Sequence, residues 1–450
     1  MSNKATPAKT RRSRRFKRNY CAHQSSSVQS TPTSWHSCSP RPSDLQSNQT
    51  EAATGSLWTT DLVLNLCISH FMFASYTAML TIIPLYVIDL GGSEWQTGVV
   101  VGSFGLLSIP IRQMAGRWIT NFGAKRVAIA GTAVLGIATL LHVGAFNVWM
   151  IIPVRVVQGI GLAIGPVATA TIIAILAPSN RRAEGMAYNG NAIALANLYS
   201  PLLAFWLFQE FGSGAAFIYA GLMSLVGTAS ALGISANRTS IPAEPISSSS
   251  ESAKPPLITR SALFPTLVFL TYTFTTAPVS TFLPQLAKLR NLGNPGLYYT
   301  SNSIVQMLAL PMSGLIADRL GRGSVIVPGL LVVGAAMFLL VIADNVMLFI
   351  LSGVLNGMGF GMLQPATQSL TVDRSPPRER GTALATLQQA WDVGGSGGAF
   401  LVGPLGSVIG IAATFGIAGA GTVLGAIGYV TFSARSRMRD QQRQREEAVP

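Results

Sequence analysis

Residues 314–322 read GLIADRLGR, a short charged segment between two long apolar runs. An earlier segment, GRWITNFG at residues 116–123, has its first and last glycines 198 positions before Gly314 and Gly321. Farther along, QGIG at 158–161 and NGMG at 356–359 are again 198 positions apart. Two pairs of segments that keep one offset indicate a structural unit that occurs twice in the chain.

The composition around these segments excludes an ordinary soluble protein. Only 11% of the 450 residues are charged, against about 25% in a soluble domain, and the mean hydropathy is +0.43. Apolar runs of about 20 residues, the length of a transmembrane helix, alternate with short polar breaks. We predict twelve spans, at residues 62–87, 97–118, 126–146, 149–177, 184–208, 214–236, 261–286, 297–317, 324–343, 346–372, 381–405 and 409–432.

The repeat divides the spans into two sets of six. We predict an N-terminal six-helix bundle at 57–236 and a C-terminal one at 261–434, joined by a Ser- and Pro-rich linker at 237–260. Residues 1–56 are predicted to form a disordered basic tail, and residues 435–450 a second tail. Because six is even, both bundles enter the membrane in the same orientation. Such parallel repeats let two bundles move about a shared central cavity.

The positive charge has a placement that predicts orientation. A net charge of +14 could indicate nucleic-acid binding, but the cations gather in alternate loops, as on the cytoplasmic side of membrane proteins. One side holds Arg117, Lys125, Arg126, Arg181, Arg182, Arg238, Lys254, Arg260, Arg319, Arg322, Arg374, Arg378 and Arg380, whereas the other holds Lys288 and Arg290. We therefore predict a multi-pass protein of the cell membrane with both termini in the cytoplasm, and no nucleic-acid partner. The basic tail is either solvated or in contact with lipid headgroups, or it is an organelle transit peptide.

The segment at 314–322 resembles the loop motif G-x-x-x-D-R-x-G-R of the major facilitator superfamily, and the likeness to that family extends over about residues 57–434. The resemblance implies an all-α transmembrane fold of twelve helices, in two six-helix bundles related by pseudo-twofold symmetry, and a function in secondary transport. It also implies a gating role for the two loops. The gating residues are Gly314, Asp318, Arg319, Gly321, Arg322, Gly116 and Gly123. In the first copy Thr120 and Asn121 replace the Asp and the Arg of the motif.

Two further segments resemble motifs of exporters in this family. Arg155 and Gly159 match the R-x-x-x-G motif of proton-coupled members. Residues 196–205 resemble the exporters' G-x-x-x-G-P-x-x-G-G motif, although only Pro201 is retained and Ala196, Ser200, Ala204 and Phe205 replace glycines. The resemblance thus implies the twelve-helix branch that exchanges drugs or metabolites for protons.

An ionised group inside a span costs about 2.5–3.5 kcal/mol on insertion scales, and two charged residues within the predicted spans stand out, Arg155 and Asp392. Asp392 is about eleven residues into the eleventh span, near its middle. Burial favours the neutral, protonated carboxyl, so Asp392 is a candidate proton carrier. Arg155, in the fourth span, is a candidate to stabilise the ionised carboxylate or to hold an anionic substrate group. Either residue could instead be a fixed structural partner of neighbouring polar groups.

Uncharged polar and aromatic side chains recur at helical spacing in several spans, which suits a cavity for a small amphiphilic solute. The candidate substrate-binding residues are Asn65, Ser69, Tyr76, Thr275, Asn302, Gln306, Gln364, Gln368, Gln388 and Trp391. Some of them will instead join helices to one another.

The sequence contains no pattern for catalysis, for a metal or for a cofactor. The Cys and His residues lack ligand spacing, and there is no Walker-type loop for ATP. We expect no enzyme activity, a monomer, and partners limited to a small organic substrate, protons and the lipid bilayer. The alternatives are a proton-coupled uptake symporter with the same fold, and a membrane receptor or anchor that transports nothing.

Overall fold

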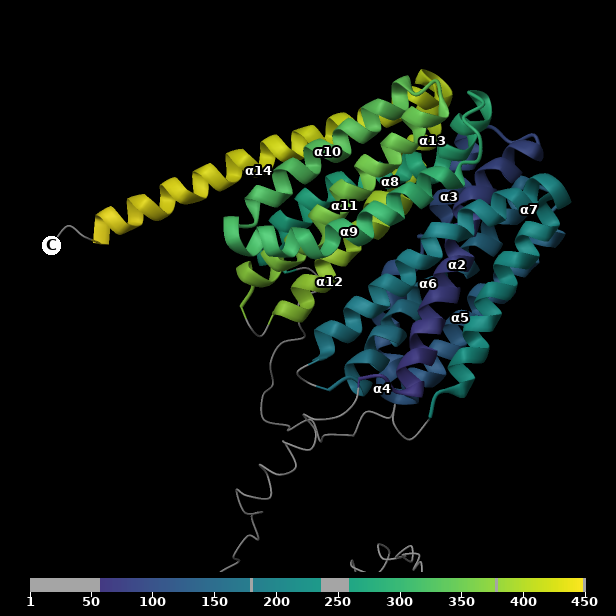
Figure 1. Ribbon diagram of the computed structural model, residues 1–450, viewed down its shortest axis with the longest axis horizontal. Coiled ribbons are helices and arrows are strands. Elements are labelled where there is room, and N and C mark those ends of the chain that lie inside the picture. Colours follow the sequence, from purple (N-terminus) through teal and green to yellow (C-terminus); the bar gives the residue numbers. More distant parts are fainter. Residues whose placement is uncertain (1–56, 179–180, 236–258, 377–378, 448–450) are drawn as a thin grey trace, which may run out of the picture. The chain divides into compact units, whose positions relative to one another are not determined.

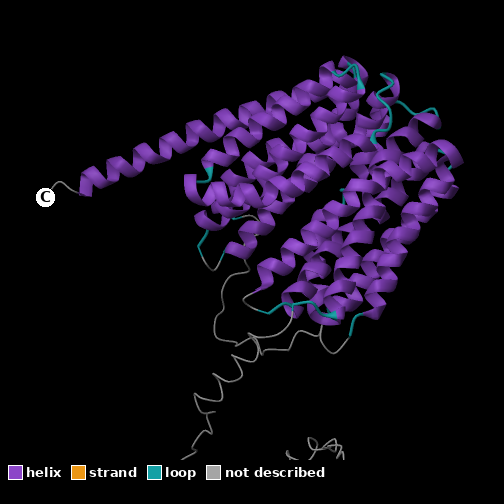
Figure 2. Cartoon of the chain, viewed as in Figure 1, coloured by secondary structure: helices purple, strands orange, loops and turns teal. Residues whose placement is uncertain are grey.

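The computed structural model describes residues 57–178, 181–235, 259–376 and 379–447, and within these ranges the ordered elements are helices, without a strand (Figure 2). The first half contains α2 (Thr60–Asp89), α3 (Glu94–Ser103), α4 (Ser108–Phe122), α5 (Ala124–Leu141), the short 3₁₀ helix η1 (His142–Gly144), α6 (Val148–Leu176) and α7 (Arg182–Gly233). The second half contains α8 (Arg260–Leu289), α9 (Gly296–Leu320), α10 (Gly323–Ile342), α11 (Val346–Arg374), α12 (Arg380–Trp391), a π-helical segment (Asp392–Gly397), α13 (Gly398–Ile409) and α14 (Ile411–Glu447). The predicted tail at 1–56 and nearly all of the linker at 237–260 lie outside the described residues.

Each of the twelve predicted spans has a helical counterpart. Eight helices among the described residues are long and apolar enough to cross a membrane by themselves. One of them, α7, contains two predicted spans that meet at Gly212, where φ is +82° and the chain reverses. The second span is split into α3 and α4, and the eleventh into α12, the π-helical segment and α13. The last helix, α14, continues to Glu447, well beyond the predicted end of its span at 432 (Figure 1).

The duplication seen in the sequence is present in the packing. A Cβ on Gly159 would lie 1.7 Å from the carbonyl oxygen of Phe104, and a Cβ on Gly357 would lie 2.1 Å from that of Asn302. These glycines and their contacts are each 198 residues apart, so equivalent helices meet at equivalent points in the two halves. Gly123 and Gly321, with φ of +84° and +89°, end the second and eighth spans in the same left-handed turn. The prediction of two six-helix bundles is therefore confirmed.

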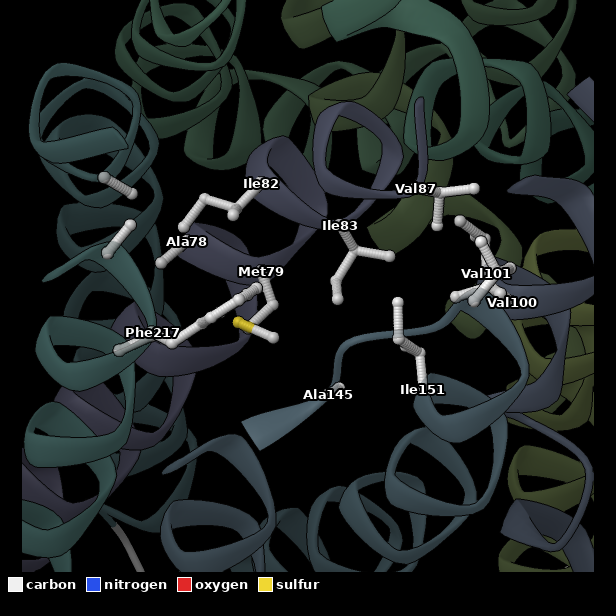
Figure 3. Close-up of a cluster of buried hydrophobic side chains, with 14 of the residues drawn as sticks. Ala78, Met79, Ile82, Ile83, Val87, Val100, Val101, Ala145, Ile151 and Phe217 are labelled. Carbon is white, nitrogen blue, oxygen red and sulfur yellow. The ribbon is translucent and has the colours of Figure 1, made fainter. Parts of the chain in front are cut away.

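We call the helices from α2 to α7 the N-bundle and those from α8 to α14 the C-bundle. The end of the bundles that holds Gly123 and Gly321 is the motif end, and the opposite end is the far end. At the far end of the N-bundle a core of apolar side chains from α2, α3, α6 and α7 includes Ile83 and Phe217 (Figure 3). Ala399 of the C-bundle packs into the same core. The apolar core therefore crosses the seam between the bundles at this end.

Backbones meet at the seam because glycines remove the side chains that would keep them apart. A Cβ on Gly98 of α3 would lie 2.5 Å from Cα of Gly403 in α13, and one on Gly102 would lie 2.7 Å from the Phe400 ring. Beside this contact the Nε2 of Gln285 donates a hydrogen bond of 3.2 Å to the carbonyl of Pro84. In the conformation described, the far end is closed by direct contact between α3 and α13.

Candidate functional site

An ion pair joins the two bundles near the middle of the spans. The guanidinium of Arg112, in α4, lies 3.3 Å through Nη1 from Oδ2 of Asp392 and 3.5 Å through Nη2 from Oδ1. These distances exceed the 2.7–2.9 Å of a tight charge-assisted hydrogen bond. The Asp392 side chain is 11% exposed and that of Arg112 is 33% exposed. The pair is therefore loose, with its acidic member buried and its basic member in partial contact with solvent.

The local backbone of the eleventh span determines the position of Asp392. This residue begins the π-helical segment, which contains the sequence GGSG at 394–397. A Cβ on Gly394 would lie 2.8 Å from the backbone nitrogen of Phe274 in α8, and one on Gly398 would lie 2.8 Å from Ala277. The glycines thus let the irregular turn pack against α8. A π-bulge at a functional residue is a recurrent feature of helices.

Arg155 does not contact Asp392, and its partners lie in its own bundle. It is 1% exposed, and its Nη1 donates a 2.6 Å hydrogen bond to Oε1 of Gln158. The Nε2 of Gln158 in turn donates to Oγ1 of Thr139 at 2.7 Å. The guanidinium carbon lies 4.6 Å from the centroid of the Phe104 ring. Among the described residues the cation is thus held by an amide and an aromatic face rather than by a carboxylate.

Phe104 and Tyr76 form an aromatic stack beside Arg155. Phe104 follows the last residue of α3, where the second span breaks, and its ring stacks on that of Tyr76 at a centroid distance of 5.3 Å. The Tyr76 phenol interacts electrostatically with both Arg155 and Asp392. The two charges that the sequence singled out are therefore neighbours of one tyrosine, although they do not touch.

Sequence reasoning missed Arg112. It lies inside the second predicted span, at 97–118, so the burial cost that identified Arg155 and Asp392 applied to it as well. The repeat was recognised from the glycines near Arg112, and the charge of Arg112 itself was not considered. Only the tertiary structure shows that Arg112, and not Arg155, meets the carboxylate of Asp392.

The candidate substrate residues fall into two groups. Asn65, Ser69 and Thr275 are at most 1% exposed, and the Nδ2 of Asn65 donates to the carbonyl of Thr169 at 3.1 Å. In this conformation these three are packed between helices and line no solvent-filled space. The others are partly or well exposed: Tyr76, Asn302, Gln306, Gln364, Gln368, Gln388 and Trp391.

Gln388 indicates the side from which Asp392 is reached. It lies one turn toward the motif end on the same helical face, and it is exposed. Trp391 precedes Asp392 and packs edge-on against Phe269, Tyr272 and Phe360 at centroid distances of 5.7, 5.9 and 5.6 Å. The carboxylate thus has a polar approach from the motif end, and the residue that precedes it belongs to an aromatic cluster of the C-bundle.

The gating-loop candidates differ in what they contact. The surroundings of Gly314 and the side chain of Asp318 are not among the described parts of the structure. Arg322 forms an ion pair of 3.1 Å with Asp373 of α11, within the C-bundle, and Arg319 is exposed. A Cβ on Gly116 would meet nothing within 4 Å. Among the described residues, no three His, Cys, Asp or Glu side chains come together to hold a metal ion.

Comparison with known proteins gives one consistent family. The sequence profile of the Major Facilitator Superfamily matches residues 62–301 and 266–449. An uncharacterized MFS-type transporter of Methanocaldococcus jannaschii is 24% identical over 341 residues, which is 74% of this chain and 87% of that protein. The quinolone resistance protein NorA of Staphylococcus aureus is 28% identical over 109 residues, 24% of this chain and 27% of NorA.

Solved structures share the fold at low sequence identity. A POT family transporter in complex with a thioalcohol-conjugated peptide superposes with a TM-score of 0.71 at 15% identity, over 83% of this chain and 96% of that one. The nucleoside transporter NupG superposes with a TM-score of 0.66 at 13% identity, over 82% and 99% of the two chains. At these identities the likeness concerns the fold alone.

Proposed function

The chain belongs to the Major Facilitator Superfamily of transporters, and from this premise we propose that it exports a small organic compound in exchange for protons. In the proposed orientation the motif end and both termini face the cytoplasm, and the protein lies in the plasma membrane. The two bundles expose a shared cavity to one side at a time. Asn302, Gln306, Gln364 and Gln368 of the C-bundle are proposed to contact the substrate.

The observation that carries the proposal is the ion pair between Arg112 and Asp392 across the seam. Its members belong to different bundles, so its strength depends on how the bundles are arranged. Protonation of Asp392 removes the negative charge and with it the attraction. A proton therefore has different free energies in the two arrangements, which is the condition for coupling its movement to a conformational change.

The exposure of the two side chains favours antiport of an organic cation. A cationic substrate group replaces Arg112 at the carboxylate, and Arg112, 33% exposed, can then be hydrated. Such a substrate and a proton compete for one carboxylate, so one leaves when the other binds. The loose geometry, at 3.3 and 3.5 Å, makes the exchange easier than it would be for a tight bidentate pair. The partly exposed ring of Trp391 suits an apolar body attached to the cation.

Symport of an anion is the second candidate, because an anionic substrate can also separate Arg112 from Asp392. An anionic substrate group binds Arg112, and Asp392, 11% exposed, must then take up a proton because it is too buried to stay charged without a partner. The proton and the substrate would then travel together. The structural likeness to POT family transporters is compatible with either scheme, since it concerns the fold.

The direction of proton movement separates the two schemes. Purified protein is reconstituted into liposomes that contain the pH dye pyranine, and ethidium, an organic cation, or a dansylated amino acid, an anion, is added outside. Antiport of the cation predicts an alkaline lumen, whereas symport of the anion predicts an acid one. A cation-driven alkaline shift that is absent from protein-free liposomes supports the proposal, and no proton movement with any member of either class contradicts it.

Matched variants identify the group that carries the proton. Asp392→Asn should abolish the pyranine signal while the protein still inserts and elutes as a single species. Asp344→Asn, which makes the same change at an exposed residue between α10 and α11, should leave the signal intact. A full signal in Asp392→Asn would remove this carboxyl from the mechanism. If no transport signal is seen at all, and deletion of residues 1–56 alone abolishes the protein's effect in cells, the receptor or anchor is favoured.

A further inference from the structure

A pocket lies in the seam at the far end, away from the ion pair. It has a volume of about 480 Å³ and is lined by both bundles, with Leu85, Phe205 and Phe208 from the N-bundle and Ala287, Lys288 and Asn291 from the C-bundle. This volume falls in the range of small-molecule sites. The N-bundle wall is mainly apolar and includes the side-chain amide of Gln209, whereas the C-bundle wall adds the Lys288 ammonium and the amides of Asn291 and Asn294.

This seam pocket exists only while the far end is closed. Directly beside it, Nζ of Lys288 lies 3.4 Å from Oδ1 of Asp89 across the seam, and Gln285 donates to the carbonyl of Pro84. When the bundles part at this end, the two walls separate. A ligand that touches both walls thus binds one conformation and not the other, and it must shift the equilibrium toward the closed far end.

The lining defines the ligand. Lys288 and Asp89 are 62% and 43% exposed, and an exposed ion pair of this length is weak, so the ammonium is available to an incoming acid. Leu85 and Phe205 are 2% and 6% exposed and present apolar surface next to it. We propose that the seam pocket binds an anionic amphiphile, a carboxylate or phosphate attached to an apolar chain, and that this ligand holds the far end closed. The proposal assumes that the bundles alternate, but not that protons are exchanged.

The test measures how often the far end opens. Thr97 is fully buried and contacts Gln285 across the seam at 3.4 Å, so Thr97→Cys reacts with a maleimide only when the seam opens. The other cysteines are replaced by serine, and decanoate is the probe. If decanoate binds only the closed form, labelling at ten times its Kd slows about elevenfold. Lys288→Gln should lose this slowing, and Lys288→Arg should keep it.

Control ligands identify the source of the anion. Decanol, with the same chain and no charge, should leave the labelling rate unchanged. Slower labelling in phosphatidylglycerol than in phosphatidylcholine nanodiscs, dependent on Lys288, would assign the site to a lipid, and an effect of decanoate alone would assign it to a soluble acid. Unchanged labelling with both anions, or equal slowing in Lys288→Gln, would overturn the proposal. Because no proton gradient is present, this outcome is independent of the transport assay.

Discussion

Replacing Gly98 with alanine should open the far end. The added Cβ would lie 2.5 Å from Cα of Gly403 and 2.6 Å from the carbonyl oxygen of Ala399, and both neighbours are backbone atoms that cannot rotate away. To restore an ordinary contact of 3.4 Å, α3 and α13 must move apart by about 0.9 Å. Overpacking of this kind costs about 1–3 kcal/mol.

The cost applies only to the conformation with the far end closed, so it changes the equilibrium between the closed and the open conformation. A difference of about 1–3 kcal/mol lowers the ratio of closed to open molecules about 5- to 150-fold. Alanine is also a better helix former than glycine, so α3 itself should not be weakened. Gly190→Ala is the matched control, because it makes the same change in a helix where the new Cβ meets nothing within 4 Å.

Distances between spin labels report the effect directly. Phe146 and Met347 are far-end residues of the N-bundle and the C-bundle, and each is 81% exposed, so labels there should disturb little. Pulsed electron resonance should show a longer distance gaining population in Gly98→Ala and not in Gly190→Ala. An unchanged distribution in Gly98→Ala would refute the view that the glycine contact closes this end.

Three further sets of substitutions test the rest of the site. Arg112→Gln should leave the protein folded but uncouple substrate movement from protons in the pyranine assay, because Asp392 loses its partner across the seam; retained coupling would argue against the pair. Gly159→Ala and Gly357→Ala should each lower the free energy of unfolding by about 3 kcal/mol, and with it the Tm, since the new Cβ would lie 1.7 Å and 2.1 Å from a carbonyl oxygen. An unchanged Tm in either variant would contradict the packing. Gln158→Leu should destabilise by about 1.5–3 kcal/mol because it removes the hydrogen bond that Gln158 accepts from the buried Arg155 cation, whereas Thr139→Val should cost less; if the two variants had equal melting temperatures, Arg155 would not depend on this network.

The twelve spans and the duplication could be predicted because each rests on short-range information. A run of about 20 apolar residues must be helical in lipid, where every backbone group needs an internal partner. The glycines at 123 and 321 end spans by left-handed turns, which glycine adopts without steric cost. Repeated spacing therefore predicted equivalent turns and equivalent close contacts in the two halves.

Other features could not be predicted from local patterns. The Asn65 and Ser69 stripe looked suitable for a cavity, yet both residues are buried, because the polarity of a helix face does not show whether another helix or water covers it. The breaks at 104–107 and at Asp392–Gly397 lie inside apolar runs. They depend on contacts with α6 and α8 that are distant in sequence.

The sequence by itself determined that this chain crosses a membrane as two like-oriented sets of six helices, because hydropathy and repeat spacing are properties of consecutive residues. Only the tertiary structure decided that Arg112, and not Arg155, faces Asp392, and that Gly98 meets Gly403. A pairing across the seam depends on how two separately inserted bundles dock, and residues nearly 300 positions apart carry no local record of that contact.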